Sequence, residues 1–172
     1  MRIQEDAWII ADTHFNHYNM IEYRQRPFFT VGDMNDALVY NWNSVVRKND
    51  QVIFLGDFSL GNDDETQKIT KWLNGRISMI MGDHDQSRSI TWWKNCGFET
   101  VIDHPVLYNH IYILSHEPEN WVANSNMSIL NIHGHTHKTY NKVQGHPYFN
   151  VSAEATNYAP IQLGSIMDSF LS

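Results

Sequence analysis

Five short apolar runs, each followed at once by Asp or His residues, constrain the fold of this chain more than any other feature. They occupy residues 8–11, 51–55, 77–81, 111–114 and 128–132 and are rich in Ile, Val and aromatic side chains. Short runs of this composition, bounded by turn residues, are typical of buried strands. We therefore expect a sheet whose strands end in polar clusters.

Helical patterns separate the first three runs. Residues 33–48 carry apolar side chains at helical spacing, and Thr30 with Asp33 resembles a capping box at the start of this segment. Residues 63–74 begin with three acidic residues and end before a glycine, as helices often do. Residues 86–95 give a third, weaker helical pattern.

The alternation of strand and helix predicts an α/β domain, with one domain spanning 1–172 and with parallel central strands. The second half reads mostly as strands, which favours antiparallel pairing there, followed by a strand near Ile161 and a short helix over 166–171. The predicted strands of that half cover residues 99–103, 106–109, 110–114, 128–132 and 148–153. Because ligands bind beyond the carboxyl ends of strands in α/β sheets, one pocket is expected to collect the polar clusters.

Composition narrows the functional classes. The 172 residues, 42% of them apolar, suffice for a substantial core. The single cysteine forms no disulfide within the chain and fits a reducing cytoplasm. No run approaches the roughly 20 apolar residues of a membrane span, so a soluble, cytoplasmic protein without a membrane partner is expected. The net charge of −7 disfavours binding a long nucleic acid through a broad basic surface.

The polar clusters carry the residue types of a metal site. Asp12-x-His14 places a carboxylate and an imidazole two residues apart, and His135-x-His137 places two imidazoles at the same spacing. On an extended chain such side chains point the same way. Asp57 and His116 follow two further runs. An isolated pair of this kind is most often a solvated turn, but five clusters after five apolar runs indicate a site. Mixed carboxylates and imidazoles suit Mn, Fe, Zn, Co or Ni better than Mg or Ca.

The clusters also form a recognisable series. They read Asp12-Thr13-His14, Gly56-Asp57, Gly82-Asp83-His84-Asp85, His116 and Gly134-His135-Thr136-His137. In this order they resemble the signature of the calcineurin-like metallophosphoesterases, over about residues 7–163. Phe15-Asn16-His17, Arg26-Pro27-Phe28 and Trp42-Asn43 resemble a small bacterial and phage branch of that superfamily. The resemblance implies a two-sheet β-sandwich flanked by helices, in four layers ordered α/β/β/α.

The resemblance also implies roles for the matching residues. Two divalent transition-metal ions, Mn before Fe, Zn, Ni or Co, would activate a bridging water as hydroxide for attack on phosphorus. His84 would assist the leaving group, while Asp85 would either orient His84 or cap the following helix. The implied ligands are Asp12, His14, Asp57 and His137 for the first ion, and Asp57, Asp83, His116 and His135 for the second.

The expected substrate is a small phosphate ester, such as a nucleotide, with a monoester or a diester bond. Arg24, Arg26 and His17 are candidate substrate contacts, because they follow the first cluster and arginine can hold phosphate through two hydrogen bonds. The alternative for all three is an ordinary surface or structural role. A compact nuclease acting on ends or single strands is a second interpretation, and long nucleic acid a weaker one.

One departure from the family pattern raises a different functional class. The family has Asn where this chain has Asp83, which is either a natural variation or a substitution introduced to trap a complex. Asp would bind a cation more strongly than Asn but would lose an amide donor and add a charge beside an anionic substrate. We expect slower turnover than with Asn. The alternative is a metal-binding scaffold that is weakly active or inactive.

Overall fold

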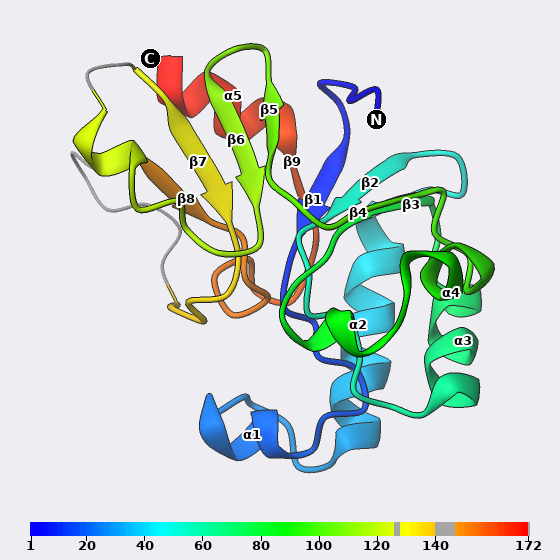
Figure 1. Cartoon of the computed structure of the whole chain (residues 1–172). Coiled ribbons are helices and arrows are strands. Elements are labelled where there is room, and N and C mark those ends of the chain that lie inside the picture. Colours follow the sequence, from blue (N-terminus) through cyan, green and yellow to red (C-terminus); the bar gives the residue numbers. More distant parts are fainter. Residues whose placement is uncertain (126–127, 140–146, 172) are drawn as a thin grey trace.

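The computed structural model describes residues 1–125, 128–139 and 147–171, which form two mixed β-sheets and five α-helices (Figure 1). The first sheet has the strand order β4-β3-β2-β1-β9 and the second has the order β5-β6-β7-β8. The strands are β1 (Trp8–Ile10), β2 (Gln51–Phe54), β3 (Arg76–Ile80), β4 (Thr100–Ile102), β5 (Val106–Tyr108), β6 (Tyr112–Ser115), β7 (Leu130–His133), β8 (Tyr148–Asn150) and β9 (Ile161–Gln162). The helices are α1 (Asn19–Tyr23), α2 (Val31–Val45), α3 (Asp63–Trp72), α4 (Ile90–Asn95) and α5 (Leu163–Leu171), with 3₁₀ turns at His84–Ser87 and Val122–Asn124.

The helices largely follow the sequence patterns. Thr30 and Asp33 form the predicted capping box at the start of α2, and a second capping box, formed by Asn62 and Glu65, begins α3. The third predicted segment is divided, because Arg88 is extended between the 3₁₀ turn and α4. Helix α1 was not predicted, since its few residues show no clear period. Among the described residues, no helix combines the length and apolarity needed to cross a membrane.

The first sheet has the parallel order expected from its alternation of strands and helices. Strands β1, β2, β3 and β4 pair in parallel, and the short β9 runs antiparallel to β1. Figure 1 shows α2, α3 and α4 together on one side of this sheet and the second sheet on its other side. Helical crossovers are the usual way to return a chain to the start of a parallel strand.

The expectation of antiparallel pairing in the second half was wrong for most of the second sheet. Strands β6, β7 and β8 are parallel, and β5 alone pairs antiparallel, with β6, among the described strands of this sheet. The segments 116–129 and 134–147 exceed the roughly dozen residues that a parallel crossover needs. The sequences of these two segments do not indicate parallel pairing, because long connections without a helical pattern are compatible with parallel and with antiparallel strands.

Two apolar cores explain why the central strands read as continuous apolar runs. Ile10 and Phe54 pack in the core shared with α2, α3 and α4. Their neighbours Ile9 and Ile53 pack in a second core, together with Leu114 of β6 and with apolar residues of β7 and α5. Since successive side chains of a strand point to opposite faces, β1 and β2 are buried on both sides.

Phe58 links the helix-side core to the loop after β2, and it allows a test of the packing. Its fully buried ring lies 5.2 Å, between centroids, from the rings of Phe15, Phe54 and Phe98. Phe58→Ala should lower the free energy of unfolding by about 3–5 kcal/mol, measured by urea denaturation. Phe29→Ala removes a ring that is 96% exposed and should change it by less than about 0.5 kcal/mol. Equal effects of the two substitutions would contradict this packing.

Candidate metal centre

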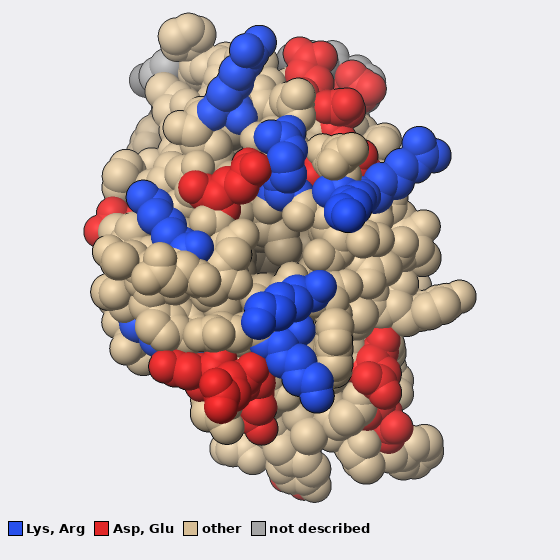
Figure 2. Space-filling view, turned by 90° about the vertical axis from the view of Figure 1, so that its right-hand side faces the viewer, with Lys and Arg blue, Asp and Glu red and all other residues tan. Residues whose placement is uncertain are grey.

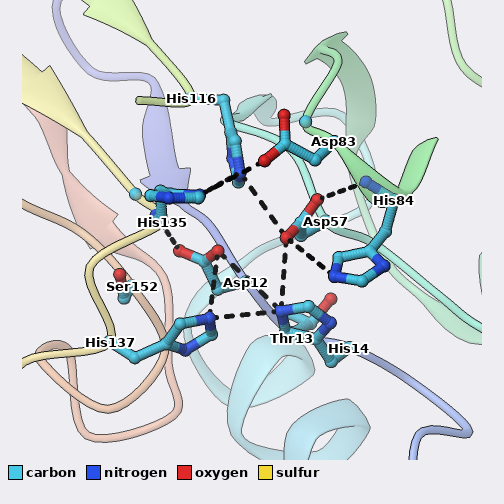
Figure 3. Close-up of polar contacts among 12 residues, drawn as sticks. Asp12, Thr13, His14, Asp57, Asp83, His84, His116, His135, His137 and Ser152 are labelled. Carbon is cyan, nitrogen blue, oxygen red and sulfur yellow. Dashed lines mark hydrogen bonds and ion pairs between the residues drawn. The ribbon is translucent and has the colours of Figure 1, made fainter. Parts of the chain in front are cut away.

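The seven predicted ligand side chains meet at the carboxyl ends of five strands, as the sequence indicated. Figure 3 shows their polar groups pointing toward one another. Together with His84, which joins His14 and Asp57 in one group, they form four overlapping groups, and within each group the ligand atoms lie within 4.8 Å of one another. The residues are Asp12 and His14 after β1, Asp57 after β2, Asp83 after β3, His116 after β6, and His135 and His137 after β7.

The first group is built around Asp12, His14 and His137. The Nε2 atoms of the two histidines lie 3.3 Å apart, and Asp12 Oδ1 lies 3.7 Å from His137 Nε2 and 3.9 Å from His14 Nε2. Asp12 Oδ1 is buried and accepts no hydrogen bond from any described residue. Here a carboxylate oxygen that receives no hydrogen bond faces two imidazole nitrogens. A divalent cation could bind all three atoms.

The second group contains Asp83, His116 and His135. His135 Nδ1 lies 3.2 Å from His116 Nε2 and 3.6 Å from Asp83 Oδ2. His116 Nδ1 is 2.8 Å from the carbonyl of Leu55, to which it donates, so its Nε2 is left for the cluster.

Asp57 joins the two groups through a single oxygen. Its Oδ2 lies 3.4 Å from His14 Nε2 and 3.5 Å from His116 Nε2. Its Oδ1 accepts a hydrogen bond of 3.0 Å from the backbone N–H of His84, which fixes the orientation of the carboxylate. Asp57 Oδ2 therefore lies between the two groups, where it could be a ligand of an ion in either one.

The backbone at this site departs from the extended form assumed for the two pairs of ligands. Five ligand residues have positive φ angles, between 48° and 64°, which non-glycine residues rarely adopt. They are Asp12, His14, Asp57, His135 and His137. Their side chains meet because each chain turns just beyond its strand, rather than because alternate residues of a strand share a face. Strained residues of this kind cluster at functional sites.

Two glycines allow a neighbouring strand end to approach the carboxylates. A Cβ atom on Gly82 would lie 2.4 Å from Asp57 Oδ1, and one on Gly134 would lie 2.5 Å from Asp12 Oδ2. Both distances are shorter than van der Waals contact, so any larger residue would displace a carboxylate.

Charge in this cluster is partly compensated within the protein. Burial alone would raise the pKa of Asp57, but its hydrogen bond with His116 and the charges of nearby histidines hold it below its usual value. Burial alone would lower the pKa of His116, but Asp57 and Asp12 raise it to about 9. Burial raises the pKa of Asp12 and lowers that of His14 well below its ordinary value. A proton on His116 thus serves as the positive charge beside the two buried carboxylates.

Asp85 has neither of its expected roles. Its buried carboxylate accepts hydrogen bonds from the backbone N–H groups of Asp57, Phe58 and Gly82, at 2.7, 3.0 and 2.9 Å. Helix α4 is capped by Ser89 instead. Asp85 therefore holds the ends of β2 and β3 together, and its contacts do not orient the His84 ring. Burial raises its pKa to about 6.

Arg26 was expected to contact substrate, and the structure contradicts this. The residue is 3% exposed, and its guanidinium donates to the carbonyls of Asp12 and Thr13 and to the carboxylate of Glu154. Glu154, which the sequence motifs did not indicate, also has its Oε2 atom 3.1 Å from His137 Nδ1. The sequence offered one signal for Glu154. It is an acidic residue among small residues, directly after the predicted strand 148–153.

A cleft of about 240 Å³ opens over the ligands. Besides five of the ligands, it is lined by His84 and by four residues of the segment around α1, which are His17, Met20, Tyr23 and Arg24. The His84 ring is 46% exposed, with Nε2 3.9 Å from Asp57 Oδ2. Two of the three predicted substrate contacts, His17 and Arg24, thus lie at the cleft, where His84 also lies.

Comparison with known proteins gives relatives without a named activity. No family model matches the chain. The chain is 37% identical, over 170 residues, to the uncharacterized protein MJ1445 of Methanocaldococcus jannaschii, covering 93% of this chain and 88% of that protein. It is 32% identical to the gene 66 protein of Mycobacterium phage L5 over 83 residues, which are 46% of this chain and 40% of that protein. The crystal structure of the protein of unknown function AQ665 from Aquifex aeolicus has a TM-score of 0.70 at 22% identity, over 95% of this chain and 98% of that one, which supports the α/β fold alone.

The raised pKa of His116 predicts how the stability of the metal-free protein depends on pH. Because the folded-state pKa of about 9 exceeds the ordinary value of 6.5, the stabilisation is complete below pH 6.5 and is lost as pH rises through 9. Between pH 7 and pH 9 in a chelator, the free energy of unfolding should fall by about 2 kcal/mol through this group. His116→Gln should remove this fall of the unfolding free energy with pH, whereas His104→Gln, at an exposed histidine, should keep it. The same pH dependence in His116→Gln would contradict the assignment of this dependence to His116.

Proposed function

We propose that this chain, which belongs to the family of the uncharacterized Methanocaldococcus jannaschii protein MJ1445, is a phosphoric ester hydrolase that uses two divalent transition-metal ions. The observation that carries the proposal is the shared oxygen of Asp57, which has a group of carboxylate and imidazole donors on each side. Such mixed donors suit Mn, Fe, Zn, Ni or Co, and we propose Mn first because the resembling family implies it.

The residues fit two adjacent ions. Asp12, His14 and His137 would hold the first ion, Asp83, His116 and His135 the second, and Asp57 both. When bound, the two ions would polarise a phosphoryl oxygen and lower the pKa of a water. Asp12 Oδ1 supports this assignment of the ligands. It is buried, and no described residue donates a hydrogen bond to it, so a cation would be its partner.

The proposed fold family is the calcineurin-like one, with its four-layer α/β/β/α sandwich. Two features support it. The two sheets share an apolar core, and α2, α3 and α4 cover the outer side of the first sheet. Helix α5 contributes to this shared core, with the ring of Phe170 6.1 Å from that of Tyr112. The order of the ligand motifs along the chain matches that family as well.

His84 is proposed to donate a proton to the leaving-group oxygen. Its backbone N–H is held by Asp57, while its ring remains half exposed at the cleft. A positioned imidazole in reach of the reacting groups is the usual proton donor in such a step. Arg24 is exposed at the cleft and makes no hydrogen bond or ion pair through its side chain among the described residues, so its guanidinium is free to hold a phosphate oxygen. His17 is proposed as a neighbouring contact.

The proposed substrate is a small nucleotide or another small phosphate ester. A cleft of about 240 Å³ is below the roughly 300–1,000 Å³ of typical ligand pockets, so it admits the phosphate and part of one substituent. Figure 2 shows basic and acidic side chains interspersed on the face that carries α3 and α4, with no continuous basic surface there for a long polyanion. A compact nuclease acting on ends or single strands is the alternative within this class.

A metal-binding scaffold without turnover is a second candidate, and Asp83 is the observation that favours it. Its carboxylate is half exposed beside His135, so it would add negative charge near an anionic substrate. Retention of His84 and of all the other ligand positions favours the enzyme.

Hydrolysis of bis-p-nitrophenyl phosphate tests the enzyme against the scaffold. With Mn added, we expect release of nitrophenol that chelation abolishes. His84→Ala should lower kcat by about 10²–10⁴-fold, because the leaving group loses its proton donor. Arg24→Ala should mainly raise KM, and His104→Ala, at an exposed histidine, should change neither. Bound Mn without hydrolysis in wild type or His84→Ala, across mono-, di- and cyclic phosphates, would identify the scaffold instead.

Asp83→Asn tests the departure from the family pattern. The substitution removes a negative charge near the phosphate and supplies an amide donor, so turnover under saturating Mn should rise. Initial rates at several Mn concentrations separate this gain from weaker metal binding. A rate that stays equal or falls at saturating Mn would refute the proposed slowing by Asp83.

A further inference from the structure

We infer that Arg26 and Glu154 form a buried pair that positions Asp12 and His137 together as ligands of the first ion. The inference rests on the proposed function, but it concerns residues outside the ligand set. Arg26 and Glu154 are 3% and 9% exposed and lie behind the site, away from the cleft. Neither residue contacts substrate in this scheme, so both are positioning residues.

Glu154 fixes the ring of His137. Its Oε2 and Oε1 atoms lie 3.1 and 3.2 Å from His137 Nδ1. A carboxylate at this distance accepts the Nδ1 proton, so the lone pair of the neutral ring is on Nε2. That Nε2 atom lies 3.7 Å from Asp12 Oδ1 and 3.3 Å from His14 Nε2, which is the ligand side of the first group.

Arg26 fixes the turn that carries Asp12. Its Nη2 donates to the carbonyl of Asp12 at 2.7 Å, and its Nη1 donates to the carbonyl of Thr13 at 2.8 Å. Asp12 has a left-handed φ of 58°, a conformation that is unfavourable for residues other than glycine. The planar guanidinium holds two successive carbonyls in one orientation, which the single ammonium of lysine cannot do.

Glu154 Oε1 joins the two halves of this arrangement. It lies 2.8 Å from both Nε and Nη2 of Arg26, while the same carboxylate accepts from His137. The end of β1 and the segment after β7 are therefore tied through one ion pair. Because both charges are buried and paired, loss of either one leaves the other without compensation.

The second group has a different support. His116 donates from Nδ1 to the backbone carbonyl of Leu55, and Asp83 is the carboxylate beside His135. The buried pair in that group, His116 with Asp57, is formed by two of the proposed ligands, and among the described residues no buried ion pair outside the ligand set supports it. Substitution of Glu154 should therefore weaken one of two cation-binding events and spare the other.

Calorimetric titration of Mn into chelator-treated protein tests this selectivity. Wild type should bind two ions. Glu154→Gln should weaken one event by about 10–100-fold, since an outer partner of a histidine ligand is lost, and Arg26→Lys should weaken the same event. Asp83→Ala should weaken the other event, and the double variant Glu154→Gln with Asp83→Ala should weaken both. Glu99→Gln, at an exposed acid, is the matched control and should behave as wild type.

Nuclear magnetic resonance of ¹⁵N-labelled histidine rings in metal-free wild type provides a second readout that needs no variant to fold. His137 should carry its proton on Nδ1 when the ring is neutral. A proton on Nε2 would overturn the inference even if Glu154→Gln fails to fold. Two unchanged events, or two equally weakened events, in folded Glu154→Gln would overturn it as well. Wild type that binds no Mn would instead refute the proposed function, and the inference with it.

Discussion

The position of the Asp57 carboxylate is the constraint on which the rest of the site depends. Its Oδ1 is held by the backbone of His84, and its own backbone N–H is held by Asp85. Its Oδ2 is then left between histidines contributed by β1 and β6, which belong to different sheets. The two sheets must therefore pack in one relative position for the ligand groups to share an oxygen. Their common apolar core maintains that position, so the chemistry of the site depends directly on core packing.

Sequence alone predicted the parallel half of the fold and the meeting of the ligands, because both follow from strong local patterns. Strands β1 and β2 are apolar on both faces, and the polar residues come directly after them. The pairing within the second sheet was not predictable in this way. The connections before β7 and β8 carry no helical pattern. Only the observed strand pairing shows that the chain crosses over to a parallel strand there instead of forming a hairpin.

The roles of individual polar residues were also hidden, for a physical reason. Arg24 and Arg26 are two positions apart and chemically identical, yet one lies exposed at the cleft and the other is buried behind it. The difference comes from Glu154, which is distant in sequence and supplies the opposite charge that makes burial of Arg26 acceptable. In the same way, Asp85 follows His84 in sequence but bonds to backbone groups at the ends of β2 and β3. Long-range pairing of this kind leaves no local periodicity.

The backbone conformations of the site are unfavourable locally, and the fold as a whole maintains them. Five ligand residues hold left-handed backbone conformations, each unfavourable by about 1–3 kcal/mol, and Asp12 keeps a buried oxygen without a donor. No single neighbouring contact stabilises all of them. The parallel sheet, the glycines that admit Asp57 and Asp12, and the buried pair of Arg26 and Glu154 together do so. If the proposed ions bind, ligand atoms held in this way beforehand would lose little freedom on binding, so the strain carried by the folded protein would raise the affinity for the cations.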